Sequence, residues 1–329
     1  MMPNSPTFSH LDHYRDMTNA PDSKSVEIRS QVLRALALNR IPGYHFAGNF
    51  FGTTFENVSS GGTLVHLAPG AHSVDSAGAI SLGGIALLAD IAMGTTIRAS
   101  KDPSTRLVTS RMHLEFTGTT PRRPLLAASS FRGAFHDEGG HQALSEVSIH
   151  QGDELICFGS GSFFAVPVPI GAPELAPFPW RHPNDPDVPP LAEEDLDDSE
   201  RSILHLADEA MNEQSSDTGF IHRFLGFSPV STESGAFAEI RNGPHIANRV
   251  GHMQGGLQLA VAALTAQASL GPEWKLNSIS TSFIKPGEGH KIRVRSQIVH
   301  TGRSTAVVRT QIMNEHRHLL EALSTHSQS

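Results

Sequence analysis

Four segments of the chain carry apolar residues in patterns that predict helices. At 26–40 and 200–213 apolar residues recur on one face at helical spacing, which is typical of amphipathic helices. At 80–97 and 250–270 nearly every position is apolar, and the only charged residue is Asp90 if His252 is neutral. A helix that is apolar on all sides must be surrounded by protein. Glycines and glutamines dilute both segments too far for a membrane span, so we expect two core helices.

Alternating apolar and polar residues after each core helix predict antiparallel strands. Such strands are expected at 125–132, 143–150, 155–166, 292–298 and 305–313. The turns between them fall near 138–140, at 152–153 and at 300–304. One helix beside several antiparallel strands is an α+β plan. We therefore expect each half of the chain to wrap a sheet around its own helix.

The two halves of the chain resemble each other at a nearly constant offset. Landmarks that match at an offset of 174 or 173 are Gly52 and Gly61 with Gly226 and Gly235, and Asp75, Gly78 and Ser81 with Asn248, Gly251 and Gln254. A repeat that occurs only twice favours a fused pseudo-dimer over a solenoid.

A proline-rich segment divides the chain. Nine prolines fall between Val166 and Pro190, a density that excludes helix and central strand and is typical of a stiff, extended linker. Phe178 and Trp180 within it predict that the linker packs along a surface. We expect a mobile N-terminus at 1–25, a first domain at 26–166, the linker at 167–190 and a second domain at 191–329.

Composition narrows the function further. The 329 residues carry a net charge of −8, which argues against a general nucleic-acid binder. The N-terminus lacks the layout of a signal peptide, and the single cysteine, Cys157, excludes an intrachain disulfide, so we expect a cytoplasmic protein. No metal site is predicted, because neither H-x-x-x-H nor H-E-x-x-H occurs, and motifs for nucleotide or dinucleotide binding are also absent.

The segment from Asn248 to Gly256, NRVGHMQGG, resembles the N-x-x-G-x-x-H-G-G motif of hotdog-fold acyl-CoA thioesterases of the phenylacetyl-CoA and 4-hydroxybenzoyl-CoA type. Gln254 takes the position of the motif's histidine. In this family an acidic residue follows nine positions later, where the second half has Ala263 and the matching helix of the first half has Asp90. The resemblance covers most of both halves and implies two hotdog domains fused as a pseudo-dimer.

Helix geometry explains why such a site needs both halves. Thioester hydrolysis requires a carboxylate and donors for the oxyanion, and the free N–H groups at a helix N-terminus are good donors. On a single helix the N-terminus and an acid eight residues further lie about 12 Å apart. Both groups must lie within about 3 Å of the reacting atoms. Two antiparallel helices satisfy this requirement by each lending its N-terminus to the carboxylate of the other.

The resemblance implies a role for each residue of the site. Asp90 would be nucleophile or general base, and the N–H of Gly255 would bind the oxyanion. Gly256 would contribute to substrate binding. Gln254 would contact the thioester carbonyl or Asp90, and Asn248 would position water or the acyl group.

A hydroxyl on the strand after the helix is also typical of the family, and Thr109 fits that place, with Thr95 and Thr96 as weaker candidates. Candidates for binding the phosphates of coenzyme A are Arg122, Arg123, Lys285 and Arg303. The reciprocal pairing sets Ser81, a residue typical of helix caps, opposite Ala263, so we expect that second site to be silent.

The leading hypothesis is an acyl-CoA thioesterase with one active site between its halves. It would need no cofactor beyond the coenzyme A that forms part of its acyl-CoA substrate. The resemblance implies a homo-oligomer, because fused hotdogs often assemble further, and exposed sheet edges leave this open. Two alternatives stay open: an enoyl-CoA hydratase or dehydratase on the same fold, and a non-catalytic acyl-CoA-binding protein.

Overall fold

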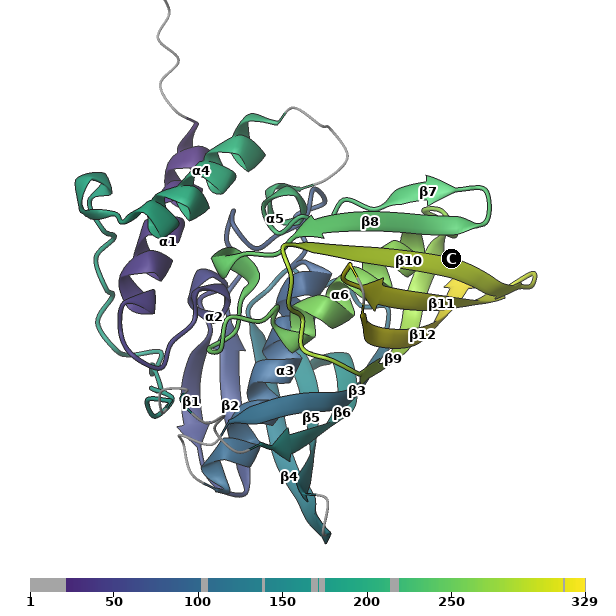
Figure 1. Ribbon diagram of the computed structural model, residues 1–329, viewed down its shortest axis with the longest axis horizontal. Coiled ribbons are helices and arrows are strands. Elements are labelled where there is room, and N and C mark those ends of the chain that lie inside the picture. The colour runs from purple at the N-terminus through teal and green to yellow at the C-terminus, as the bar shows by residue number, and fades with distance from the viewer. Residues whose placement is uncertain are drawn as a thin grey trace, which may run out of the picture.

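A single antiparallel sheet runs through the whole molecule (Figure 1). The computed structural model describes residues 22–101, 106–137, 140–166, 171, 175–213, 219–315 and 317–328. The sheet has twelve strands in the order β1-β2-β4-β5-β6-β3-β9-β12-β11-β10-β8-β7. In the first half the strands are β1 (Thr54–Val58), β2 (Gly62–Leu67), β3 (Leu107–Phe116), β4 (Leu125–Asp137), β5 (Gly140–Gln151) and β6 (Glu154–Ala165). In the second half they are β7 (Val230–Thr232), β8 (Gly235–Arg241), β9 (Trp274–Phe283), β10 (Lys291–Thr301), β11 (Thr305–Met313) and β12 (His318–Gln328).

The halves join edge to edge where β3 pairs with β9. Arg111 lies opposite Ser282 and Glu115 lies opposite Ser278 in this antiparallel pair. The strand order on one side of the junction repeats in reverse on the other, so a pseudo-twofold axis passes between β3 and β9. The expected α+β fold, two hotdog domains with sheets joined at one edge, is confirmed.

Each half of the sheet wraps around one long apolar helix. These are α3 (Leu82–Ala99), which packs on β2, β4, β5 and β6, and α6 (Gly255–Ala268), which packs on β8 to β12. The two helices also pack against each other (Figure 1). By length and composition α3 passes the test for a membrane span, but it lies mostly buried inside the protein, as expected for a core helix.

The loops that lead into the two core helices are built alike. The Oδ1 atom of Asn248 accepts hydrogen bonds from the N–H groups of Val250 and His252, and Gly251 turns the chain at φ +81°. Asp75 caps the matching loop of the first half in the same way, with Gly78 at φ +75°. The expected start of the second core helix at residue 250 is wrong, because this capped loop delays α6 to Gly255.

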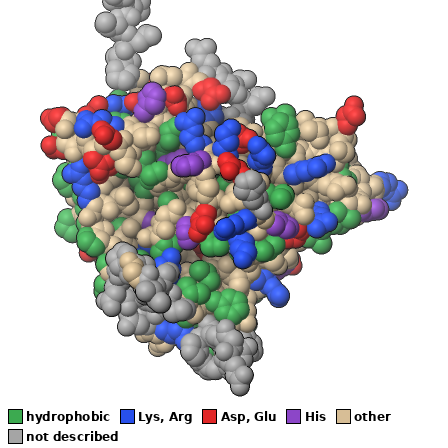
Figure 2. Space-filling model, in the orientation of Figure 1, with side chains coloured by type: hydrophobic (Ala, Val, Ile, Leu, Met, Phe, Trp, Pro, Cys, Tyr) green, Lys and Arg blue, Asp and Glu red, His purple; other side chains and the backbone are tan. Residues whose placement is uncertain are grey.

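Two amphipathic helices cover one side of the molecule: α1 (Ser23–Asn39) and α4 (Asp198–Asn212). Acidic and basic side chains are interspersed over them (Figure 2). Arg29 of α1 pairs with Glu193 at 2.8 Å, and Arg40 pairs with Glu200 of α4 at 2.7 Å. Since α1 begins at Ser23, the N-terminus expected to be mobile through residue 25 is already helical at its end; residues 1–21 lie outside the described part of the chain.

Two short helices, α2 (Phe46–Phe50) and α5 (Phe220–Phe224), are not anticipated by the sequence pattern. Each follows the first long helix of its half and presents two phenylalanines. The ring centroids of Phe50 and Phe224 lie 4.9 Å apart, and those of Phe220 and Phe224 lie 5.4 Å apart. This aromatic cluster joins the two halves, with the short helices η1 (Glu193–Asp195) and η2 (Pro244–Ile246) completing the secondary structure.

The proline-rich segment lies against the first half, as its aromatic residues predict. Phe178 is buried and packs on Trp180 and on Phe55 of β1, with centroids 4.9 and 5.8 Å away. The N–H of Phe55 donates to the carbonyl of Arg181 at 2.7 Å, which ties the segment to the edge of the sheet. Residues 167–170 and 172–174 of the expected linker lie outside the described residues.

Candidate active site

Asp90 lies in the middle of α3 and faces the N-terminus of α6. Its side chain is partly exposed, although the preceding turn of α3 is buried. Gln254, the N-cap residue of α6, donates from Nε2 to Oδ2 of Asp90 at 2.5 Å. The two residues are 164 positions apart in the chain, and only the antiparallel packing of α3 on α6 brings them together.

Three donors from two elements hold the carboxylate of Asp90. Besides Gln254, the N–H of Gly256 donates to Oδ2 at 3.3 Å, and the hydroxyl of Thr109 on β3 donates to Oδ1 at 3.1 Å. Oε1 of Gln254 accepts from the N–H of Leu257 at 2.9 Å, which fixes the amide so that its NH₂ group points to Asp90. Charge-assisted hydrogen bonds of this kind fix the direction of a carboxylate.

The pKa of Asp90 is raised from its ordinary value of 3.8 to about 6, because burial disfavours its charged form. The hydrogen bonds from Thr109 and Gly256 and the positive charge of Arg98 oppose this rise. The carboxylate is therefore charged at neutral pH and yet basic enough to accept a proton near that pH, which suits a general base.

The first turn of α6 lies directly beside this carboxylate. A Cβ atom built on Gly255 would lie 3.1 Å from both Asp90 Oδ2 and Thr109 Oγ1. The N–H of Gly255 has no acceptor among the described residues. At Gly256 a Cβ atom would lie 2.3 Å from the carbonyl oxygen of Ala86, so only glycine lets α6 approach α3 this closely. The two glycines thus bring the N-terminus of α6 to the acid of the other helix, with the N–H of Gly256 bonded to Asp90 and that of Gly255 without an acceptor among the described residues.

The reciprocal site has none of these groups. At the start of α3 the N-cap Ser81 accepts from the N–H of Gly84 at 3.2 Å, as expected for a helix cap. The position of Asp90 is taken by the buried Ala263, and Leu276 stands where Thr109 does, as the third residue of its strand. Phe227 lies 3.3 Å from the place of a Cβ on Gly83, so an aromatic ring occupies the space beside this helix start.

The structure therefore brings five of the sequence candidates together: Asp90, Gln254, Gly255, Gly256 and Thr109. The hydrogen bonds of the Asn248 side chain are made within its own loop and not with these five residues. Its Oδ1 atom closes the loop before α6, which orients that loop and leaves only the amide NH₂ group for other partners.

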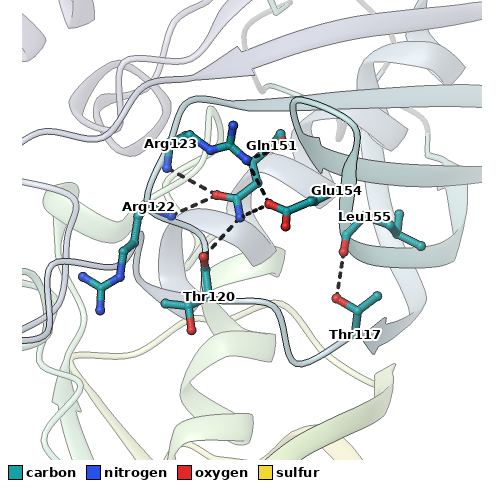
Figure 3. A network of polar contacts seen from close by, with 7 residues as sticks. All are labelled: Thr117, Thr120, Arg122, Arg123, Gln151, Glu154 and Leu155. Atoms are coloured by element: carbon teal, nitrogen blue, oxygen red, sulfur yellow. Dashed lines mark hydrogen bonds and ion pairs between the residues drawn. The ribbon is translucent and has the colours of Figure 1, made fainter.

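The basic candidates are scattered. Arg122 donates to the carbonyl of Ala77 in the loop before α3, and Arg123 pairs with Glu154 at 2.9 Å. Gln151 accepts from both backbone N–H groups of these arginines (Figure 3). Because this network is attached to the start of α3, the two arginines belong to the end with the reciprocal site.

Lys285 is exposed and lies two residues before Gly287, whose carbonyl accepts from the N–H of Met253 just before α6. Lys285 is thus the basic candidate nearest to the start of α6. Arg303 is exposed in the turn between β10 and β11, at the tip of a hairpin.

Two basic residues near Asp90 escaped the sequence analysis. Arg98 stands eight residues after Asp90 on α3, and Arg249 lies in the capped loop before α6. Both guanidinium groups lie over the ring of Phe178, at 5.6 and 5.3 Å from its centroid. The spacing from Asp90 to Arg98 is a signal in the sequence, but the approach of Arg249 depends on the packing of the two halves.

Comparisons with known proteins agree with this architecture. Residues 244–327, from η2 into β12, match the family model described as the acyl-CoA thioesterase N-terminal domain. The match covers about a quarter of the chain and lies within its second half, and the strand order repeats the same plan in the first half. A comparison with curated proteins gives no match.

Similar solved structures cover most of the chain at low sequence identity. The TesB protein of Mycobacterium avium subsp. paratuberculosis is 13% identical, with a TM-score of 0.48 over 84% of this chain and 96% of that one. Acyl-CoA thioesterase II TesB2 from Mycobacterium marinum is 12% identical, with a TM-score of 0.45 over 84% and 94%. The 12:0-ACP thioesterase from Umbellularia californica is 8% identical, with a TM-score of 0.49 over 81% and 94%. At these values the fold assignment depends on the strand order of this chain itself.

The described residues contain no group of three or more histidine, cysteine, aspartate or glutamate side chains that would hold a metal ion. Cys157 is buried in β6 and burial raises the pKa of its thiol to about 12, so it is a core residue with little thiolate character.

Proposed function

We propose that this protein hydrolyses acyl-CoA thioesters at one active site between its two halves. The contact between Asp90 and the N-terminus of α6 carries the proposal, because it unites an acid, its orienting donors and a polarised helix start. The match of the second half to an acyl-CoA thioesterase domain supports the substrate class.

In the proposed reaction Asp90 activates a water molecule. The water oxygen attacks the thioester carbon while the carboxylate of Asp90 takes its proton, and the carbonyl oxygen becomes an oxyanion that the N–H of Gly255 stabilises. Collapse of this intermediate breaks the carbon–sulfur bond. The departing thiolate of coenzyme A recovers the proton from Asp90, so that acid and thiol are the products.

Direct attack by the carboxylate of Asp90 is the other route that this geometry allows. The carboxylate oxygen bonds to the acyl carbon, the carbon–sulfur bond breaks and the thiolate of coenzyme A leaves, and water then hydrolyses the resulting anhydride to the acid product and the free carboxylate. In both routes Gln254 and Thr109 keep the carboxylate aimed at the reacting carbon, so these residues position the base.

The proposed enzyme works with one site per chain. Ala263, Leu276 and Phe227 deprive the reciprocal site of a carboxylate, a hydroxyl and open space. We further propose that no cofactor takes part besides the coenzyme A of the substrate, that Lys285 contributes to binding its phosphates, and that the protein is a cytoplasmic homo-oligomer.

A thiol-release assay tests the proposal. Purified protein is mixed with acyl-CoAs of several chain lengths and a thiol-reactive dye, and wild type is compared with Asp90→Asn and Asp75→Asn. Removing a general base lowers rates by about 10²- to 10⁴-fold, so Asp90→Asn is expected to be nearly inactive.

Asp75→Asn is the matched control, because asparagine keeps the hydrogen bonds that close the loop before α3, as Asn248 does before α6. Equal hydrolysis by wild type and Asp90→Asn would exclude Asp90 from the mechanism. Tight acyl-CoA binding without turnover by the wild type would instead identify a binding protein.

A further inference from the structure

The arginines Arg98 and Arg249 form a partly buried pair of positive charges beside the proposed active site. Both guanidinium groups contact the ring of Phe178, and the charge of Arg249 disfavours the charged form of Arg98. The pKa of Arg98 is lowered to about 10, first by burial and then by Arg249, while the negative charge of Asp90 opposes this. Two neighbouring guanidinium charges that are partly withdrawn from water destabilise the folded protein unless an anion lies beside them.

The described residues give this pair too few partners. Arg249 donates from Nη2 to the carbonyl of Ala176, but its Nε and Nη1 atoms are buried without an acceptor in the described part of the chain, and so is Nε of Arg98. His45 is close to both arginines and is neutral near pH 7, since burial lowers its pKa to about 4, so it cannot balance their charge. The negative charge of Asp90 offsets one of the two guanidinium charges. Among the described residues, one positive charge and several N–H donors of the arginines therefore stay without a partner.

Arg98 lies on the same side of α3 as Asp90, with the buried Gly94 between them. Asp90, Gly94 and Arg98 are spaced four residues apart and so share one face of the helix. Arg98 folds back over Gly94, where its Nη1 atom lies 3.7 Å from the place of a Cβ, and Phe163 of β6 lies 3.6 Å from the same point. Because Gly94 has no side chain, the guanidinium group of Arg98 can lie back along the helix toward Asp90, from which its backbone is about 12 Å away by the helix rise.

The arginine pair occurs only on the side of the molecule that has the carboxylate. The pseudo-twofold axis relates Arg98 to Gly271 and Arg249 to Ser76, and neither of these is charged. The reciprocal site has thus lost the acid, the hydroxyl and both arginines together. A role in holding the fold would apply to both halves, whereas a role in substrate binding applies to the site with Asp90 alone.

On the basis of the proposed function, we propose that Arg98 and Arg249 bind a carboxylate at the far end of the acyl chain, so that the preferred substrates are ω-carboxyacyl thioesters. One carboxylate neutralises the excess charge and accepts from the unused N–H groups, as planar guanidinium groups do best. The phosphates of coenzyme A offer the same chemistry, but they are multiply charged and strongly hydrated, and the pair lies beneath the buried Phe178.

Kinetics on matched thioesters test this subsite. The wild type is expected to hydrolyse octanedioyl-CoA with a kcat/KM at least tenfold above that for octanoyl-CoA, with hexanedioyl- and decanedioyl-CoA used to find the best length. Arg98→Gln and Arg249→Gln are each expected to lower kcat/KM for octanedioyl-CoA by ten- to a hundredfold and to change octanoyl-CoA hydrolysis less than threefold. Arg98→Lys keeps the charge and is expected to retain part of the preference.

The control variant is Arg309→Gln, because Arg309 pairs with Glu321 on the exposed face of β11. The melting temperature and kinetics of this variant should match those of the wild type. Melting temperatures of all variants show whether they are folded. A wild type without preference for octanedioyl-CoA overturns the proposal.

S-octanoyl-pantetheine separates the two sources of the anion. If Arg98→Gln slows octanoyl-CoA and octanedioyl-CoA equally and leaves S-octanoyl-pantetheine unchanged, the arginines bind phosphate and the acyl-end assignment is wrong. Calorimetric binding of octanedioyl-CoA and octanoyl-CoA to Asp90→Asn needs no turnover. A preference there that Arg98→Gln abolishes supports the subsite even if no thioester is hydrolysed, so failure of the two proposals can be told apart.

Discussion

The raised pKa of Asp90 predicts a stability difference that can be measured without any substrate. In the unfolded chain this carboxyl has its ordinary pKa of 3.8, and in the folded protein the pKa is about 6. The folded state therefore holds the proton more tightly, and folding loses stability as the pH rises from about 4 to about 6. Above pH 6 the loss is complete and constant.

A shift of this size corresponds to at most about 3 kcal/mol, and partial exposure of the side chain makes about 2 kcal/mol a fair expectation. Asp90→Asn removes the titrating group and so removes this pH dependence. The melting temperature of Asp90→Asn minus that of the wild type should therefore increase by roughly 3 °C between pH 4 and pH 8.

Differential scanning fluorimetry across this pH range measures the difference, and other titrating groups cancel because both proteins carry them. Asp75→Asn controls for the removal of an acidic side chain as such. A difference that stays constant from pH 4 to pH 8 would refute the reasoning, since Asp90 would then titrate alike in the folded and unfolded chains. In turnover the same group predicts that kcat/KM falls to half near pH 6 as the base becomes protonated.

Three further substitutions test other parts of the site. Thr109→Val removes a hydrogen bond that lowers the pKa of Asp90, so the acidic limb of the pH–rate profile should move to higher pH and kcat/KM should fall by about tenfold. Gly256→Ala places a methyl group 2.3 Å from the carbonyl oxygen of Ala86 and should destabilise the protein by about 2–3 kcal/mol, measured by urea unfolding; a loss below about 0.5 kcal/mol would show that α3 and α6 separate easily. Ala263→Asp should lower the melting temperature at pH 8 without adding thiol release, whereas a doubled rate would reveal a second working site.

Repetition within the chain made most of the fold predictable. The offset of 173 between Ser81 and Gln254 is also the offset between the first residues of α3 and α6, Leu82 and Gly255. The strand expected at 305–313 coincides with β11, because its alternating residues face a buried helix on one side only. The short helices α2 and α5 escaped prediction because five residues do not complete a periodic pattern, and only their aromatic packing stabilises them.

The site was predictable where chemistry follows from a motif and unpredictable where it follows from packing. The position of Asp90 nine residues after the cap of α3 indicated a partner on the other helix, and Gln254 and Gly256 contact it. The positions of the basic residues depend on packing and could not be predicted from the sequence. Arg122 and Arg123 adjoin the start of α3, while Arg98 and Arg249, 151 positions apart in the sequence, meet over Phe178.

The pairing of β3 with β9 has a consequence for how this protein can change over time. In a dimer of identical chains every substitution appears twice, so an acid lost from one helix is lost from both and activity disappears. With both halves in one polypeptide, the two core helices can differ, so that the first carries Asp90 where the second carries Ala263. The covalent link thus permits each copy of a repeated plan to hold residues that the other copy does not carry.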